Sequence, residues 1–147
     1  MTSSLDHDLL AVTLFSEVFM VDQLARTRFG KLLPKGMELS HFTVLNHLAH
    51  SNKPRTPAEL AKNFNLTRGA MTNTLNKLDW AGHVHINPDW DDARRKQVVI
   101  SPAGRTACET AIAAITPLLK ETFEDIGTDR LSEMLPILRE LRIRLAD

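Results

Sequence analysis

One stretch of the chain has side chains suited to reading the bases of DNA. It begins at Thr67 and continues to about Trp80, and its periodicity predicts a helix with Met71, Leu75 and Leu78 on the inner side. The outer side is polar and free of acids: Thr67, Arg68, Gly69, Thr72, Asn73, Asn76 and Lys77. Asparagine can pair with adenine in bidentate fashion, arginine with guanine, and threonine can meet a thymine methyl group. A solvated helix more often uses glutamate–lysine pairs, so the pattern favours DNA contact over a plain surface helix.

A second charged stretch lies at the tip of a predicted hairpin. It reads Asp91-Asp92-Ala93-Arg94-Arg95-Lys96 and separates two segments of alternating apolar residues. One interpretation is a solvated run of charges that neutralise one another. The other is a DNA-contacting wing, in which Asp92 braces Arg94 for a narrow A·T-rich minor groove. In that interpretation Arg95 and Lys96 contact phosphates.

The other reactive residue types do not form a catalytic or metal-binding set. Among the histidines, His47 with His50 and His83 with His85 are close in sequence, but neither pair has a cysteine nearby or a common zinc-motif spacing. Surface or hydrogen-bonded histidines are therefore expected, with phosphate contact as an alternative for the second pair. The single cysteine, Cys108, is expected to be a small buried residue. The sequence thus predicts no enzyme, no metal and no cofactor.

The composition is that of a globular domain with a basic middle. The chain has 147 residues, and 18 basic side chains balance 18 acidic ones. Residues 1–52 have 4 basic and 5 acidic side chains, residues 53–96 have 8 and 5, and residues 97–147 have 6 and 8. The middle is therefore where we expect an anionic partner. Because acidic residues interrupt the apolar N-terminal stretch, we expect no signal peptide and no membrane span, and a cytoplasmic location.

Helix and turn signals place both charged stretches in one structural unit. Helices are expected over about residues 5–29, 39–50, 56–63, 67–80, 103–126 and 128–145, with strands near residues 84–86 and 98–100. In the turn between the third and fourth helices, Asn65 is expected to adopt a positive φ and Leu66 to be buried. Helix, short turn, helix and hairpin form a winged helix-turn-helix, so the predicted fold class is mainly α with a small β-hairpin wing.

The helices at the two ends are more apolar than a solvated monomer needs. The first has apolar side chains on more than one face, and the last has them at steps of three and four. Those of the last helix are Leu131, Met134, Leu135, Leu138, Leu141 and Leu145. The residues alone leave two alternatives. Either the terminal helices pack on each other within one chain, or they pack against a partner.

Three segments of the sequence resemble the MarR (multiple antibiotic resistance regulator) family of bacterial transcription factors. They are GMELSHFTVLNHL, TPAELAKNFNLTRGAMTNTLNKLDWAG and DDARRKQVVISPAG. The third is similar to the family's Asp-x-Arg followed by Val-x-Leu-Thr-x-x-Gly, with Asp92 and Arg94 at the paired positions. The chain departs from the family's pattern at Glu38, His41 and Ile100-Ser101.

The resemblance implies a homodimer joined through the terminal helices. Residues 1–36 and 102–147 would dimerise, and residues 37–101 would form the winged helix-turn-helix that binds DNA. The expected interface residues are Leu9, Leu131, Leu135, Leu138, Leu141 and Leu145. The resemblance also implies a small aromatic or phenolic effector. Its pocket would be lined by Phe15, Phe19, Met37, His41 and Phe42, with ordinary core packing as the alternative for each.

The predicted function is sequence-specific regulation of transcription. The protein would bind an inverted-repeat operator in double-stranded DNA as a homodimer, as a repressor that responds to a ligand. The alternative is a winged-helix module that binds another protein and no DNA. The acid-free face of the predicted helix disfavours this alternative, because binding another protein does not require a face without acidic side chains.

Overall fold

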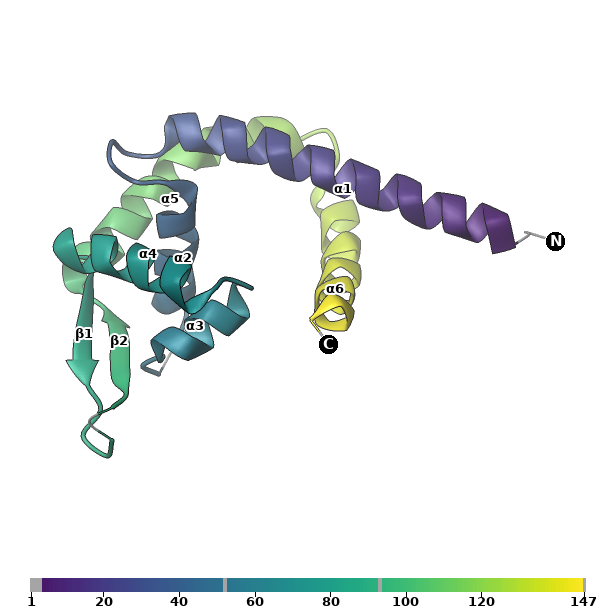
Figure 1. Cartoon of the computed structure of the whole chain (residues 1–147). Coiled ribbons are helices and arrows are strands. Elements are labelled where there is room, and N and C mark those ends of the chain that lie inside the picture. The colour runs from purple at the N-terminus through teal and green to yellow at the C-terminus, as the bar shows by residue number, and fades with distance from the viewer. Residues whose placement is uncertain (1–3, 52, 93, 147) are drawn as a thin grey trace.

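The chain folds into six helices and one hairpin in a computed structural model that describes residues 4–51, 53–92 and 94–146 (Figure 1). The elements are α1 (Ser4–Leu32), α2 (Leu39–Ala49), α3 (Pro57–Asn63), α4 (Arg68–Trp80), β1 (Val84–Pro88), β2 (Lys96–Ile100), α5 (Pro102–Phe123) and α6 (Thr128–Leu145). The two strands form an antiparallel sheet. The predicted fold class is confirmed. No helix in these described residues is long and apolar enough to cross a membrane.

The helix-turn-helix of α3 and α4 is set by two threonine caps. The Thr56 hydroxyl accepts a hydrogen bond from the Glu59 backbone N–H at 3.1 Å, and the Thr67 hydroxyl accepts one from the Ala70 N–H at 3.1 Å. Each cap satisfies a backbone donor that the first turn of a helix leaves free. Asn65 between them has a φ of 50°, as predicted, which an asparagine tolerates.

The prediction that Leu66 is buried is wrong. Its side chain is 41% exposed, although its backbone N–H donates to the Ala61 carbonyl at 2.8 Å and so closes the turn. Phe64 packs against the core at this turn. The turn is thus fixed by the Asn65 backbone and by Phe64, and Leu66 contributes a main-chain bond rather than a buried side chain.

The main core lies where α2, α3, α4, the hairpin and α5 meet. Its buried members are Val44, Leu45, Leu48, Leu60, Ala61, Met71, Leu75, Leu78, Val84, Val98 and Cys108. Cys108 is buried as predicted, and burial raises the pKa of its thiol. A smaller cluster of Leu33, Ala111 and Ile115 packs the end of α1 against α5. The surfaces of α4 and the hairpin therefore rest on a rigid support.

The hairpin is tied to the segment before α3 through β2. Val84 pairs with Ile100, and Val98 pairs with both Ile86 and Arg55. The Arg55–Val98 bridge, with N···O distances of 3.1 and 2.7 Å, joins the segment before α3 to β2. This bridge was not predicted from the sequence. These backbone bonds fix the hairpin relative to α3.

Ser101 and Gly104 tie α5 to the start of the hairpin. The Ser101 hydroxyl donates to the Gly82 carbonyl at 2.6 Å and accepts from the Gly104 N–H at 2.9 Å. A Cβ at Gly104 would collide with the His83 carbonyl, so the start of α5 can pack this closely only with glycine.

The terminal helices do not bury their apolar faces within the chain. No described residue of α1 or α6 is buried, and the N-terminal half of α1 extends past the other elements (Figure 1). Leu9 is 63% exposed and Leu138 is 39% exposed. Leu135 and Leu145 are also exposed, whereas Leu131 and Leu141 are half-buried. Of the two alternatives, packing of the terminal helices on each other within one chain is not what the fold shows.

Candidate nucleic-acid interface

The predicted DNA-contacting residues of α4 share one exposed face. Met71, Thr74, Leu75 and Leu78 are buried on the inner side of the helix. Every residue predicted to contact DNA is exposed on the other side: Thr67, Arg68, Gly69, Thr72, Asn73, Asn76 and Lys77. A Cβ on Gly69 would meet nothing within 4 Å, so the fold itself does not require glycine there.

One acidic residue qualifies the description of this face. The face was predicted to be free of acids, but Asp79 lies exposed in the last turn of α4. Positions separated by seven residues lie on nearly the same side of a helix, so Asp79 lies on the side of Thr72, two turns closer to the C-terminal end of α4. The acid-free part of the face therefore ends at Lys77 and covers about the first three turns of α4.

The hairpin loop is held by Asp92, in a different way from the prediction. The Asp92 carboxylate accepts a hydrogen bond from the backbone N–H of Arg94 at 3.0 Å, and its ion pair at 4.0 Å is with the side chain of Arg95. The expected side-chain brace between Asp92 and Arg94 is thus replaced by a brace on the Arg94 backbone. A carboxylate accepts readily from an N–H two residues on, which closes the loop and leaves the Arg94 side chain exposed. Ala93 lies outside the described residues.

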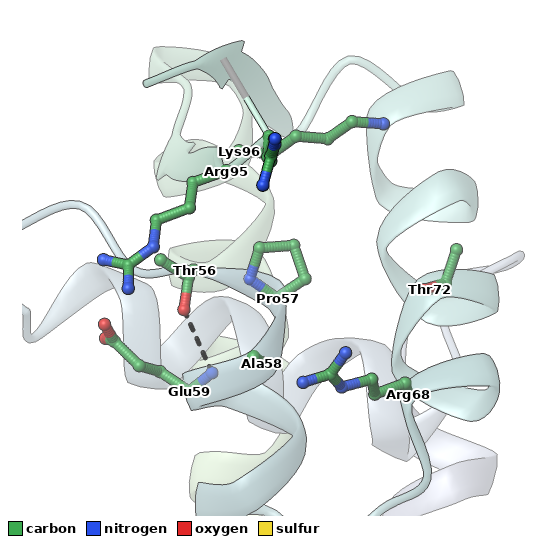
Figure 2. A pocket seen from close by; sticks show the side chains of 9 residues that line it. Thr56, Pro57, Ala58, Glu59, Arg68, Thr72, Arg95 and Lys96 are labelled. Atoms are coloured by element: carbon green, nitrogen blue, oxygen red, sulfur yellow. Dashed lines mark hydrogen bonds between the residues drawn. The ribbon is translucent and has the colours of Figure 1, made fainter. Parts of the chain in front are cut away.

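An open hollow of about 530 Å³ separates α4 from the hairpin (Figure 2). Arg68 and Thr72 of α4 lie on one side of it and Arg95 and Lys96 on the other, with Pro57 between them. Its complete lining is Thr56, Pro57, Ala58, Glu59, Arg68, Thr72, Arg94, Arg95 and Lys96. The contribution of α3 was not predicted from the sequence. It depends on the Arg55–Val98 bridge, which brings the start of α3 to the hairpin.

The charges around this hollow favour an anion. Four of the lining side chains are cationic, and Glu59 is the one carboxylate. The carboxylate of Glu59 also lies 3.7 Å from the guanidinium of Arg55. A surface with several cations near one another attracts a polyanion, and this attraction weakens with added salt.

A second hollow, of about 710 Å³, lies behind the C-terminal half of α4. Two residues of the predicted effector pocket, Met37 and His41, line it. The complete lining is Pro34, Lys35, Gly36, Met37, His41, Asn76, Lys77, Leu78, Trp80, Ala81, His83, Ala107 and Thr110. Lys77 therefore belongs both to the exposed face of α4 and to this hollow.

Three residues of the predicted effector pocket are not part of this hollow. Phe42 packs against both core clusters, as ordinary core packing would have it. Phe15 and Phe19 lie on α1 with their ring centroids 6.2 Å apart. The single chain therefore does not bring Phe15 and Phe19 to this hollow, because spacing along α1 gives the face of a residue but not the direction in which the helix leaves the core.

His41 lies at the wall of the second hollow, where its surroundings lower the pKa of its imidazole. Its Nδ1 accepts a hydrogen bond from the Glu38 backbone N–H at 3.2 Å, and its Nε2 lies 3.9 Å from the Glu38 carboxylate. Burial lowers the pKa of His41, Glu38 opposes this, and Lys77 and His83 lower it further. An acceptor role at Nδ1 requires that this nitrogen has no proton, which agrees with the direction of the pKa shift.

His47 is a second histidine whose pKa is lowered by the fold. Its Nε2 is buried with no hydrogen-bond partner in the described part of the chain, and its ring meets the ring of Phe64 edge-on at 5.4 Å. Burial lowers the pKa of His47, and the charge of Arg55 lowers it further.

Because of these two histidines, we expect the free energy of unfolding to decrease at acidic pH. Their pKa values are lowered in the folded chain, so below about pH 6.5 the unfolded chain binds more protons. Stability is then complete above that pH and falls as the pH decreases toward the folded pKa values. We expect the urea midpoint to fall between about pH 7.5 and pH 5.5. In a His41→Gln/His47→Gln variant this fall should shrink by more than half, whereas His7→Gln on α1 should leave it unchanged. An unaltered fall in the double variant would contradict the assignment.

The order of α3, a short turn, α4 and the antiparallel hairpin shows that this is a winged helix-turn-helix protein. The sequence profile of the MarR family matches residues 35–95. The HTH-type transcriptional regulator YdgG of Bacillus subtilis is 32% identical over 91 residues, which is 60% of this chain and 60% of YdgG. The resemblance to the MarR family is thus confirmed over residues 35–95, a range that contains the first two of the three segments and the beginning of the third.

Two solved structures extend the similarity of fold to nearly the whole chain. The transcriptional regulator BldR from Sulfolobus solfataricus superposes with a TM-score of 0.80 at 24% identity, over 97% of this chain and 99% of BldR. A mutant MarR from E. coli in complex with operator DNA superposes with a TM-score of 0.76 at 24% identity, over 95% of this chain and 99% of MarR. The long α1 and α6 are thus part of the shared architecture.

Proposed function

We propose that this protein is a transcriptional regulator that binds an inverted-repeat operator in double-stranded DNA as a homodimer. The observation that carries the proposal is the hollow between α4 and the hairpin, where exposed polar side chains of one helix face the cations of Arg94, Arg95 and Lys96. In this proposal the protein acts in the cytoplasm. The E. coli MarR structure, which shares this fold, contains operator DNA, which supports the same use of the fold here.

In this proposal α4 enters the major groove. Asn73 and Asn76 are exposed at adjacent turns, from which an asparagine amide reaches an adenine edge. Arg68, at the first position of α4, is placed to contact guanine or phosphate. Next to the Thr67 cap, Gly69 leaves the backbone of the first turn open to phosphate. Thr72 faces the hollow, where a phosphate or a thymine methyl group would lie.

The hairpin then contacts the neighbouring minor groove. Arg94 is exposed at the loop, and its backbone is fixed by Asp92. A narrow A·T-rich minor groove has the negative potential that attracts such an arginine. Arg95 and Lys96 line the hollow between the two grooves, which suits phosphate contact.

The terminal helices supply the homodimer in this proposal. Residues 1–36 and 102–147 form the dimerisation part, and residues 37–101 the DNA-binding part. The exposed leucines of α6 and Leu9 of α1 need a cover that the chain itself does not provide. A second copy with the same exposed faces would cover them and would place two α4 helices on the two halves of a palindrome.

A small effector would act from the second hollow. Lys35, Lys77, His41 and His83 line it, its lining has no carboxylate, and Met37 and Trp80 add apolar surface. This lining suits an aromatic or phenolic acid. Because Lys77 and Asn76 belong to both the hollow and α4, an effector there would compete with DNA for the same segment. The simplest outcome is a repressor that leaves its operator when the effector binds.

Base reading and phosphate contact should separate in two alanine variants. Asn73→Ala is expected to weaken binding by about 1–3 kcal/mol, mainly for operators with the preferred base pair at its own position. Lys96→Ala should weaken binding to all sequences alike and lower the salt dependence. Affinities measured on operators changed at one base pair at a time check this. Equal, sequence-blind losses in both variants would mean that Asn73 does not read bases.

The salt dependence of binding tests the proposed function against its alternative. A winged helix that binds DNA releases counterions from phosphates, so its affinity should fall steeply between about 50 and 200 mM salt. The measurement is fluorescence anisotropy of a labelled A·T-rich duplex titrated with the protein at several salt concentrations. A module that binds only proteins would leave the anisotropy unchanged even at the lowest salt.

A further inference from the structure

We propose that Trp90, at the tip of the hairpin, is a further DNA-contacting residue whose indole packs against the deoxyribose wall of the minor groove beside Arg94. The proposal rests on the proposed function and deepens it. The observation behind it is that Trp90 is 99% exposed, so the fold gives this ring no packing role. The hairpin extends away from the helices, which places its tip where only a bound molecule can cover it (Figure 1).

The backbone on both sides of Trp90 is fixed. The Asp89 N–H donates to the Arg95 carbonyl at 3.0 Å, and the Asp91 N–H donates to the Asp89 carboxylate at 3.0 Å. The Arg95 N–H in turn donates to the Asp92 carbonyl at 3.0 Å. Trp90 is therefore presented by a closed loop rather than by a loose segment, and the loop is the one that carries Arg94.

The charges beside Trp90 decide which part of DNA it would contact. Asp91 is exposed next to it, and a carboxylate is repelled by phosphate. The Asp89 carboxylate is already used within the loop. A flat apolar ring between such neighbours suits the uncharged sugar surface of the minor groove, a groove in which several DNA-binding proteins place apolar side chains. Arg94, four residues on, would supply the attraction to the negative potential of the groove.

The position of Trp90 favours DNA over a second copy of the chain as its partner. The exposed apolar residues offered for dimerisation lie on α1 and α6, whereas Trp90 lies in the loop between β1 and β2. The tip of this hairpin is away from α6 (Figure 1). Arg95 of the same loop lines the cationic hollow. The surface that continues from Trp90 is thus the proposed DNA surface.

Tryptophan fluorescence tests the contact directly, because the chain has only two tryptophans. In a Trp80→Phe variant, Trp90 is the one remaining fluorophore. Titrated with an A·T-rich duplex of about 30 base pairs at low salt, its emission should shift to the blue and its quenching by acrylamide should fall at least about twofold. Acrylamide is neutral, so DNA does not repel it. In the matched Trp90→Phe variant the remaining Trp80, which is 94% exposed beside the second hollow, should change less.

Affinity gives the second readout. Trp90→Ala should weaken binding at least about fivefold, whereas Trp90→Phe should keep most of the affinity, because a flat apolar ring remains. Full binding of labelled duplex with unchanged Trp90 emission and unchanged affinity of Trp90→Ala would overturn the proposal and leave the proposed function standing. An absence of duplex binding by the parent protein would overturn both.

Discussion

Replacing Leu138 by aspartate is expected to turn the protein into a monomer that no longer binds its operator tightly. Leu138 lies in the middle of α6 and is 39% exposed in the single chain. It belongs to a stripe of apolar side chains along one side of this helix, here called the leucine stripe: Leu131, Met134, Leu135, Leu138, Leu141 and Leu145. If a second copy covers the stripe, the charge must be buried or the interface must open, and either costs roughly 3 kcal/mol or more. Sedimentation should show a monomer. Operator affinity should fall by more than about a hundredfold, because the two half-sites are no longer bound together.

A matched variant separates the stripe from the charge itself. Ser132→Asp places the same charge on an exposed position of α6, about a third of a turn from the stripe. It should remain dimeric. Leu138 belongs to neither core cluster, so the helix content of Leu138→Asp by circular dichroism should be close to that of the parent. A Leu138→Asp protein that stayed dimeric and bound DNA normally would remove α6 from the interface.

Arg94→Ala should weaken operator binding by about tenfold per half-site, or about a hundredfold for a dimer, which is roughly 1.4 kcal/mol for each site. The loss should be largest on operators with A·T-rich flanks, where the minor groove is narrow. Folding should be unaffected, because an exposed loop substitution changes stability by no more than about 0.5 kcal/mol. Arg94→Lys should restore only part of the affinity, since lysine is more strongly hydrated. Anisotropy on two operators that differ only in their flanks measures this.

Two aspartates of the same loop provide the control for the wing. Asp92→Ala removes the acceptor for the Arg94 N–H and the ion pair with Arg95, so it should weaken binding mildly. Asp91→Ala also removes one negative charge from the loop. Because its carboxylate is exposed toward the solvent, it should leave binding unchanged or strengthen it. Equal binding by the parent and Arg94→Ala on both operators would remove the hairpin from the mechanism and leave α4 alone.

Local signals predicted most of the fold because each element carries its own boundary residues. Thr56 and Thr67 cap their helices, and Asn65 adopts the positive φ that the turn between those helices requires. The alternation of apolar residues indicated both strands, and Val84 and Val98 are buried on the side that faces the core. The exposed face of α4 could also be read from the sequence, since a helix of known phase has only one side opposite Leu75 and Leu78.

The features that sequence reasoning missed depend on contacts between elements. The hollow beside α4 includes Pro57 and Glu59 because Arg55 pairs with Val98 and brings the start of α3 to the hairpin. For the same reason, the fold does not bring Phe15 to the hollow that Met37 and His41 line. Only the tertiary fold shows that this part of α1 leaves the core. Asp92 was assigned to the Arg94 side chain because spacing does not distinguish a backbone donor from a side-chain donor.

The central claim is that α4 and the hairpin read a specific sequence in double-stranded DNA. The most direct measurement is selection of random-sequence duplexes by the pure protein, followed by sequencing of those retained over several rounds. We predict an inverted repeat whose half-sites are about one helical turn apart, with A·T-rich flanks where the hairpins lie. The same selection with Asn73→Ala should lose preference at one position in each half-site. Retained duplexes without any shared sequence, at a salt concentration where the protein still binds, would contradict the claim.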